Sequence, residues 1–222
     1  MPEAYLNRGN IFYRQKDFEK ARANYDETIE LEPENVEAYV NRANLYIDTG
    51  DAENALHDFE RAIKYRPDYS KAYLNRARLY FLLARHDDAL ADYNKALELD
   101  PDYDKAYINR ALLHYDRKNY DAAIADCSKA VELNNKSLEA YLNRGLSYIQ
   151  KEQFENAIHD FDRVLSQQND HLDALLNRGV ANSKNGKFAA AIDDYEAVLK
   201  LAPDNHQVKS YLEIARQRLN ES

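Results

Sequence analysis

The hexapeptide Ala4-Tyr5-Leu6-Asn7-Arg8-Gly9 (AYLNRG) decides the fold, because close variants of it recur along the chain at a constant interval. The copies are AYVNRA at 38–43, AYLNRA at 72–77, AYINRA at 106–111, AYLNRG at 140–145 and ALLNRG at 174–179. Each copy begins 34 residues after the one before it. A period of this length is typical of stacked helical hairpins, which bury a continuous core between neighbouring repeats. The sequence therefore predicts an all-α solenoid.

The period divides the chain into six predicted repeats over residues 2–205, each made of a first and a second helix, and a final segment over 206–222. The predicted repeats are 2–35, 36–69, 70–103, 104–137, 138–171 and 172–205. The final segment departs from the repeat but keeps an apolar helical face, which predicts a capping helix followed by a short tail. The residues of that face are Val208, Tyr211, Leu212, Ala215 and Leu219.

Small and aromatic residues occupy fixed positions in each repeat. The first copy carries Tyr5, Gly9 and Phe12 in its first helix, and Ala21, Tyr25 and Pro33 in its second helix and the following turn. Small residues let paired helices approach closely, and proline ends a helix. This pattern resembles the tetratricopeptide repeat (TPR) family over residues 2–205. The resemblance implies a right-handed α-solenoid whose first helices line an inner surface with a peptide groove.

Two predicted turns lack the proline. Asn135 and Asn169 stand where the other copies have Pro33, Pro67, Pro101 or Pro203. Asparagine tolerates the left-handed conformation that ends many helices. We therefore expect these two turns to end the helix in that way and to be less rigid than the others.

We number repeat positions by the residues of the first copy, so that position 8 is Arg8 and the same position recurs every 34 residues. An arginine occupies position 8 in all six copies, and five copies carry an aspartate sixteen residues later. In an antiparallel hairpin these two positions lie near the same level, so we expect a hydrogen-bonded pair across the helices rather than contact with a ligand. The pairs are Arg42–Asp58, Arg76–Asp92, Arg110–Asp126, Arg144–Asp160 and Arg178–Asp194. The first copy has Asn24 in the aspartate position, so we expect Arg8 to be held more weakly.

Composition and charge argue against several classes of protein. A formal net charge of −9 disfavours nucleic acid and acidic membranes as partners, because both attract basic surfaces. No apolar run is long enough to span a membrane, and Met1-Pro2-Glu3-Ala4 does not begin a secretory signal. The single cysteine, Cys127, cannot form an internal disulfide. We therefore expect a cytoplasmic location.

No arrangement of residues predicts catalysis, a metal site or a cofactor. Cys127 occupies the repeat position of Tyr25, where the fold needs a buried packing group. His114 and His86 likewise replace aromatic residues of other copies, and neither has a second ligand at metal-binding spacing. We therefore do not expect an enzyme.

One asparagine per repeat occupies position 7 of the first helix, and we call this set the asparagine row. A carboxamide both donates and accepts hydrogen bonds, so it can pair with a peptide unit of a ligand. A similar row in the superhelix of O-GlcNAc transferase contacts the backbone of extended polypeptides. The alternative is that the side chains bond to neighbouring repeats and stabilise stacking. The row comprises Asn7, Asn41, Asn75, Asn109, Asn143 and Asn177.

Residues near the asparagine row vary between copies, which indicates selectivity. Repeat position 10 changes from polar to apolar along the chain, through Asn10, Asn44, Arg78, Leu112, Leu146 and Val180. Basic residues gather centrally, so we expect an acidic segment of the partner there. The predicted peptide-binding residues are the asparagine row together with Asn10, Asn44, Lys71, Arg78 and Lys105.

The sequence thus predicts a protein-interaction scaffold that binds an extended peptide or protein segment in a concave groove. Two alternatives remain open. A self-associating structural module is one, because the first repeat has no preceding cap over its apolar face. A non-catalytic targeting arm of a larger enzyme is the other.

Overall fold

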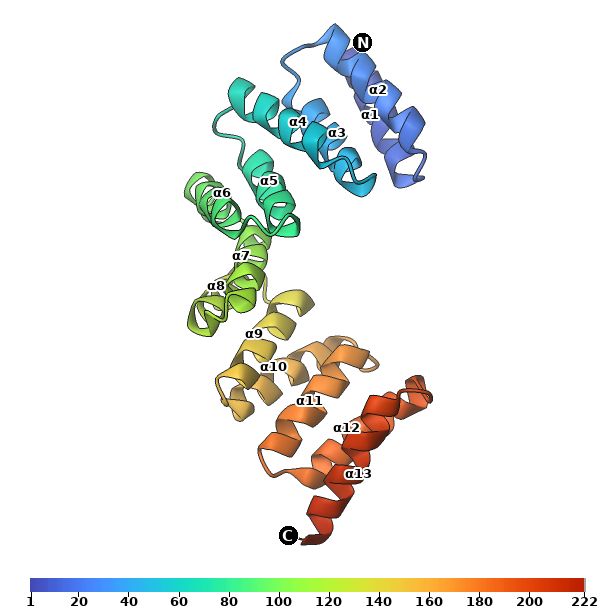
Figure 1. Ribbon diagram of the computed structural model, residues 1–222, viewed down its shortest axis with the longest axis vertical. Coiled ribbons are helices and arrows are strands. Elements are labelled where there is room, and N and C mark those ends of the chain that lie inside the picture. Colours follow the sequence, from blue (N-terminus) through green and yellow to red (C-terminus); the bar gives the residue numbers. More distant parts are fainter. Residues whose placement is uncertain (222) are drawn as a thin grey trace. The chain divides into compact units, whose positions relative to one another are not determined.

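The computed structural model describes residues 1–221, which form thirteen α-helices and no strand (Figure 1). The predicted all-α class is confirmed, while Ser222, the end of the predicted tail, lies outside the described residues. The helices are α1 (Pro2–Arg14), α2 (Phe18–Leu31), α3 (Val36–Asp48), α4 (Ala52–Tyr65), α5 (Ser70–Leu82), α6 (His86–Leu99), α7 (Asp104–Asp116), α8 (Tyr120–Leu133), α9 (Leu138–Gln150), α10 (Phe154–Gln167), α11 (Leu172–Lys184), α12 (Phe188–Leu201) and α13 (His206–Glu221).

The chain divides into two compact units, unit 1 (Met1–Ala106) and unit 2 (Tyr107–Ser222). In unit 1 the hairpins are α1–α2, α3–α4 and α5–α6, and α2 also packs on α3, as α4 does on α5. Unit 2 repeats this packing through α9–α10 and α11–α12, and α13 packs against α12. The exact repeat boundaries stay a prediction, because packing alone does not define where one repeat ends.

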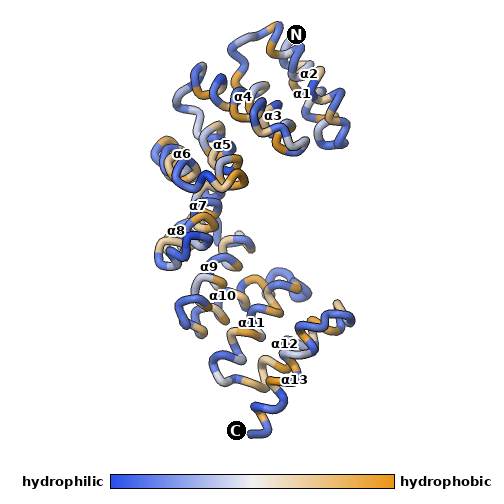
Figure 2. The backbone as a smooth tube through the Cα atoms, in the orientation of Figure 1, coloured by the Kyte–Doolittle hydropathy of each residue, from blue (hydrophilic) through white to orange (hydrophobic). Residues whose placement is uncertain are grey.

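The two helices of a hairpin approach closely at the small positions. A Cβ atom added to Gly145 would lie 2.7 Å from Cε1 of Phe161, and one added to Gly179 would lie 2.6 Å from Cε1 of Tyr195. Ala21 on α2, which occupies the small position of the second helix, is completely buried. Apolar and polar residues alternate along the helices, so each helix buries one face and exposes the other (Figure 2).

Buried arginine–aspartate pairs join the first and second helices, as predicted. Arg42 donates from Nε to Asp58 Oδ2 at 2.7 Å and from Nη2 to Oδ1 at 2.8 Å. Asp58 is 1% exposed, so its charge depends on this two-point contact. In the first hairpin, Arg8 Nε donates to Asn24 Oδ1 at 2.5 Å. The other four predicted pairs form in the same way: Arg76–Asp92, Arg110–Asp126, Arg144–Asp160 and Arg178–Asp194.

Several of these arginines also reach the preceding hairpin. Arg42 Nη1 donates to Asp26 Oδ1 on α2 at 2.6 Å, and Arg144 Nη1 donates to Ser128 Oγ on α8 at 3.1 Å. Burial lowers the pKa of Arg42, but its hydrogen bonds to Asp58 and Asp26 outweigh this and raise the pKa above the usual value. One side chain thus ties three helices together and fixes how each first helix is rotated.

The left-handed conformation expected in the turns without proline is not found, while their lower rigidity stays a prediction. Asn134, which precedes Asn135, has φ −141° and ψ 89°, close to the φ −140° and ψ 82° of Glu32, which precedes Pro33. Neither Asn135 nor Asn169 is left-handed. The same backbone hydrogen bond closes the turns with and without proline. It joins Asn35 N to Glu32 O at 3.0 Å, Ser137 N to Asn134 O at 3.1 Å and His171 N to Gln168 O at 3.2 Å.

Left-handed residues occur instead in the turns within hairpins. Gly50 and Gly186 have φ of 81° and 77° there, a conformation that costs glycine nothing. Ala84 adopts the same conformation with φ 56° between α5 and α6. The other residues of this kind are Lys16, Lys118 and Glu152.

Ala84→Gly should therefore raise the free energy of unfolding. The left-handed conformation costs an L-residue about 1–2 kcal/mol, and the greater freedom of glycine in the unfolded chain offsets part of the gain. We expect a net increase of up to about 1 kcal/mol in a urea titration. Ala91→Gly, at an exposed position inside α6, is the control and should lower stability by about 1 kcal/mol. An equal decrease in the free energy of unfolding in both variants would contradict the assignment of strain to Ala84.

His114 sits beside one of the buried pairs. Its Nε2 lies 3.9 Å from Asp126 Oδ2, and its buried Nδ1 has no hydrogen-bond partner within residues 1–221. Burial lowers the pKa of His114, and Arg110 and Arg117 lower it further, whereas Asp126 opposes them. The folded state therefore favours the neutral imidazole.

This lowered pKa predicts a loss of stability in mild acid. The unfolded chain takes up a proton on His114 near pH ~6.5, above the pH at which the folded chain does, so stability falls as the pH drops through that range. His114→Tyr restores the residue type of Tyr46 and Tyr148 at this repeat position. Its stability relative to the parent, from urea titrations between about pH 8 and pH 5, should increase as the pH falls. A difference that is independent of pH would refute this explanation.

Candidate ligand-binding surface

The predicted peptide-binding residues lie on the first helices at different depths. Within the asparagine row, Asn7 is exposed, while Asn41, Asn75, Asn109, Asn143 and Asn177 are half-buried. Three predicted basic residues, Lys71, Arg78 and Lys105, are exposed. The row is therefore not a uniform surface, and its members need separate description.

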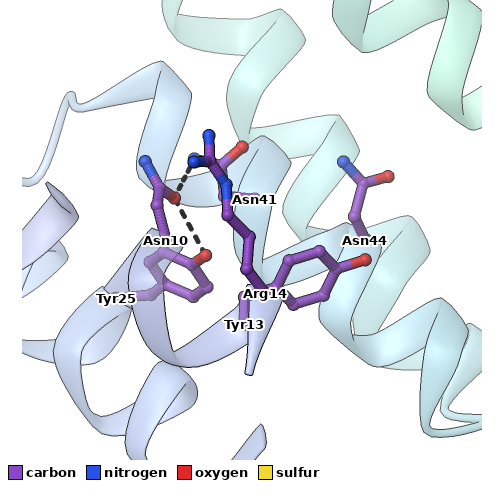
Figure 3. Close-up of a pocket in the computed structure, with 6 residues that line it drawn as sticks. All are labelled: Asn10, Tyr13, Arg14, Tyr25, Asn41 and Asn44. Atoms are coloured by element: carbon purple, nitrogen blue, oxygen red, sulfur yellow. Dashed lines mark hydrogen bonds between the residues drawn. The ribbon is translucent and has the colours of Figure 1, made fainter. Parts of the chain in front are cut away.

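Unit 1 contains a cavity of about 290 Å³ between α1 and α3 (Figure 3). Asn10 is at its centre, because its Oδ1 accepts hydrogen bonds from Asn41 Nδ2 at 2.9 Å and from the Tyr25 hydroxyl at 2.9 Å. The nearby carboxamide of Asn44 and the side chain of Arg14 complete a polar lining. The cavity is lined by Asn10, Tyr13, Arg14, Tyr25, Asn41 and Asn44.

The hydrogen bonds of the asparagine row show which of its side chains bond within the protein and which lack a partner. Asn41 bonds to the preceding hairpin through Asn10, so at this position the stacking role is realised. Asn177 Nδ2 donates within its own helix, to the carbonyl of Asp173 at 2.7 Å. Asn143 Nδ2 is buried and has no acceptor among the described residues. A buried donor without a partner costs about 1–3 kcal/mol, which leaves Asn143 short of an acceptor in the free chain.

Position 13 of one repeat contacts position 14 of the next along this surface. Tyr13 donates its hydroxyl to Asp48 Oδ2 at 2.5 Å, and Gln150 Nε2 donates to the Tyr115 hydroxyl at 3.3 Å. Burial and the Asp48 carboxylate both raise the pKa of Tyr13. These side chains were not predicted as site residues, because no regularity of residue type marks either position in the sequence.

Unit 2 contains a second cavity, of about 410 Å³, between α7, α9, α11 and α13. Its walls combine apolar and polar side chains. The apolar and aromatic lining residues are Tyr115, Leu146, Ile149, Leu176, Val180 and Tyr211. The polar lining residues are Gln150, Glu152, Asn177, Lys184 and Gln207.

Repeat position 10 contributes different residue types to the two cavities. Position 10 contributes Asn10 and Asn44 in unit 1 but Leu146 and Val180 in unit 2. Of the predicted site residues, Asn10, Asn41 and Asn44 meet in the first cavity and Asn177 lies in the second. The rest line neither cavity: Asn7, Asn75, Asn109, Asn143, Lys71, Arg78 and Lys105.

The described residues give little support for a reactive cysteine or a metal site. Cys127 is completely buried in a cluster with Ala111 and Ala123, and burial raises the pKa of its thiol to about 12. Residues 1–221 contain no group of side chains arranged to hold a metal ion. Over the same range, each helix is too short or too polar to cross a membrane.

Sequence profiles place the chain in one family. The profile described as tetratricopeptide repeat matches residues 40–104 and 142–206, more than half of the chain. A TPR repeat profile matches residues 9–50, and a further tetratricopeptide repeat profile matches residues 104–137. A comparison with curated proteins finds no match.

Solved structures with the same fold are similar over most of their length. PilW, a type IV pilus biogenesis factor, is 20% identical, with a TM-score of 0.84 over 95% of this chain and 98% of PilW. Pseudomonas aeruginosa PilF is 15% identical, with a TM-score of 0.84 over 95% and 96%. YrrB, described as a TPR protein with an unusual peptide-binding site, is 22% identical, with a TM-score of 0.71 over 86% and 97%. At these identities the likeness shows the fold alone.

The bond between Asn41 and Asn10 predicts that this part of the row contributes to stability. Asn41→Ala should lower the free energy of unfolding by about 0.5–1.5 kcal/mol, the value of a typical hydrogen bond. Asn7→Ala changes the same repeat position where the side chain is exposed, so it should have almost no effect. Urea titrations of both variants test this. A loss in Asn7→Ala as large as that in Asn41→Ala would show that the bond is not its cause.

Proposed function

The chain belongs to the tetratricopeptide repeat family, and on that premise we propose that it is a protein-interaction scaffold whose first helices bind an extended segment of a partner protein. The observation that carries the proposal is the cavity of unit 1, where Asn10, Asn41 and Asn44 meet. Carboxamides at this density can exchange hydrogen bonds with the backbone of a ligand whatever its side chains. The proposal includes no catalytic step and assigns the chain to the cytoplasm.

Charge supports an acidic segment as the ligand of unit 1. Arg14 lines the cavity, and Arg78 and Lys71 are exposed on α5. None of these three cations forms an ion pair with a carboxylate among residues 1–221. An acidic residue of a ligand would find a cation without displacing an internal partner, and the attraction would weaken as salt is added.

A solved structure with a similar fold supports the proposal, because it is described as binding a peptide. YrrB is described as having a peptide-binding site, and its fold covers most of this chain. A segment held by backbone contacts would bind with modest dependence on sequence, whereas the variable residues at position 10 would supply the preference for one partner over another.

The functional role of the row can be tested through Asn75, Asn109 and Asn143. Replacing all three with alanine should weaken binding tenfold or more, at about 0.5–1.5 kcal/mol for each lost hydrogen bond. Stability should change less than affinity, because Asn143 Nδ2 makes no internal hydrogen bond within the described residues. The measurements are a pull-down with the parent chain to identify a partner, its affinity for both proteins by calorimetry, and a denaturant titration.

Comparing the change in affinity with the change in stability separates ligand contact from repeat stacking as the role of the asparagine row. Weaker binding with a nearly unchanged unfolding midpoint supports ligand contact. Unchanged affinity with a large loss of stability would assign these asparagines to stacking of the repeats and refute their place in the groove.

A further inference from the structure

Helix α1 exposes a face that is buried in the other first helices. In α3, repeat positions 4 and 11 are Ala38 and Leu45, which are 0% and 2% exposed. In α1 the same positions are Ala4, which is exposed, and Ile11, which is 54% exposed. Arg8 lies between them in the sequence and is exposed as well. We call Ala4, Arg8 and Ile11 the end face of α1.

In the other hairpins of unit 1 this face is covered by the second helix of the preceding hairpin. Ala38 and Leu45 of α3 lie in one core cluster with Ala21 and Tyr25 of α2. The same arrangement joins α5 to α4, where Phe59 takes the place of Tyr25. Helix α1 packs on α2 and α3, and neither covers its end face, because Ile11 stays exposed (Figure 1).

Arg8 also lacks the partner that a covering helix supplies. Arg42 Nη1 donates to Asp26 Oδ1 on α2, the helix that covers α3, at 2.6 Å. Arg8 donates only from Nε, to Asn24, and forms no ion pair within residues 1–221. Because Asn24 stands where the other hairpins have aspartate, the charge of Arg8 is not balanced within its own hairpin either. A carboxylate brought by a covering helix would find free guanidinium N–H groups.

The covering helices of this chain define the kind of helix that fits the end face. A small and an aromatic residue four positions apart lie on one side of the covering helix, since residues i and i+4 share a face. The residue directly after the aromatic one accepts a hydrogen bond from the arginine of the covered helix. These residues are Ala21, Tyr25 and Asp26 in α2, and Ala157, Phe161 and Asp162 in α10.

A second copy of this chain fits the end face less well than a partner protein does. Two end faces brought together would place one Arg8 guanidinium against the other, and like charges repel. The helices of the covering kind are already engaged, because α2, α4, α8, α10 and α12 each pack on the helix that follows. The complementary occupant is therefore a helix of another protein with an acidic residue.

We infer that the end face of α1 docks an amphipathic helix of a partner protein. This helix presents a small and an aromatic residue, four positions apart, to Ala4 and Ile11, and its next residue, an acidic one, to Arg8. It lies on α1 as α2 lies on α3. The surface differs from the one on which the proposed function rests, because Ala4, Arg8 and Ile11 line neither cavity.

A stapled peptide with the sequence of α10, Phe154–Gln167, tests this inference on the full chain. In the protein this helix covers α11, whose Arg178 donates from Nη1 to Asp162 at 2.5 Å. An isolated helix of 14 residues is marginal in water, so a hydrocarbon staple joins positions 155 and 159, which are exposed in α10. Binding of the fluorescein-labelled peptide is measured by fluorescence anisotropy.

Two isoleucines of nearly equal exposure provide the variant and its control. Ile11→Asp places a charge in the apolar part of the end face and should weaken peptide binding about tenfold or more. Ile214→Asp is the control, because Ile214 on α13 is 52% exposed and lies outside the end face, so the affinity should stay nearly unchanged. Equal affinity in Ile11→Asp and the parent, or no binding to the parent, would overturn the inference and leave the proposed function standing.

An exchange of charges tests the contact with Arg8. Arg8→Glu in the chain and Asp162→Lys in the peptide should each weaken binding, because each change brings like charges together. The two changes combined should restore most of the affinity. A combined loss equal to the sum of the two single losses would overturn the contact between Arg8 and the acidic residue.

Thiol protection locates the bound peptide on the chain. Ala4→Cys introduces a thiol on the end face, and Ser210→Cys introduces one at an exposed position of α13 as the control. The native Cys127 is completely buried and does not compete for the reagent. Saturating peptide should slow the modification of position 4 and leave that of position 210 unchanged. Equal rates at position 4 with and without the peptide would overturn the inference.

Sedimentation of the chain alone distinguishes a partner helix from a second copy. We expect any association of the parent chain to be the same in Ile11→Asp. A concentration-dependent dimer that Ile11→Asp abolishes would show that a second copy covers the end face, and would overturn the inference.

Discussion

The arginine at repeat position 8, which is half-buried in the second to sixth copies, makes the interaction on which the rest of the structure depends. Its guanidinium binds an aspartate of its own hairpin at two points, and Arg42, Arg144 and Arg178 also bond to the second helix before it. A buried carboxylate such as Asp58 is stable only while this contact is made. The bond therefore fixes the rotation of each first helix, and through it the direction in which positions 7, 10, 13 and 14 face.

Fixing the structural positions leaves the remaining ones free to vary in chemistry. Arginine, the small residues and the second-helix aromatic group hold the hairpin together, so position 10 can be asparagine in one unit and leucine in the other. The two cavities show this freedom: Asn44 contributes a carboxamide to the first, and Val180 contributes an apolar surface to the second. A single repeat pattern thus places different residue types in the two cavities of one chain.

Features that recur in every repeat could be predicted from the sequence, whereas features of a single repeat could not. The 34-residue interval predicts the helices, and the pairing of Arg42 with Asp58 follows from two residue types at constant separation. The left-handed conformation expected at Asn135 is absent, because the chain there closes the same backbone bond as at Pro33, from Ser137 N to Asn134 O. The contact between Tyr13 and Asp48 could not be predicted, because no fixed pair of residue types recurs at these two positions, and the bond joins residues 35 apart in the sequence.

Helix α13 follows the pattern of a first helix, with Val208 and Ala215 completely buried at repeat positions 4 and 11, but it differs at two structural positions. At the arginine position it carries Leu212, which is buried against the preceding hairpin and needs no aspartate partner. At the small position it carries exposed Glu213, which prevents a second helix from approaching as closely as α12 approaches Gly179. The face that would receive such a helix is thus polar, while Tyr211 lines the second cavity. Because these changes concern different faces of one helix, Leu212 can pack against the preceding hairpin while Glu213 stays exposed.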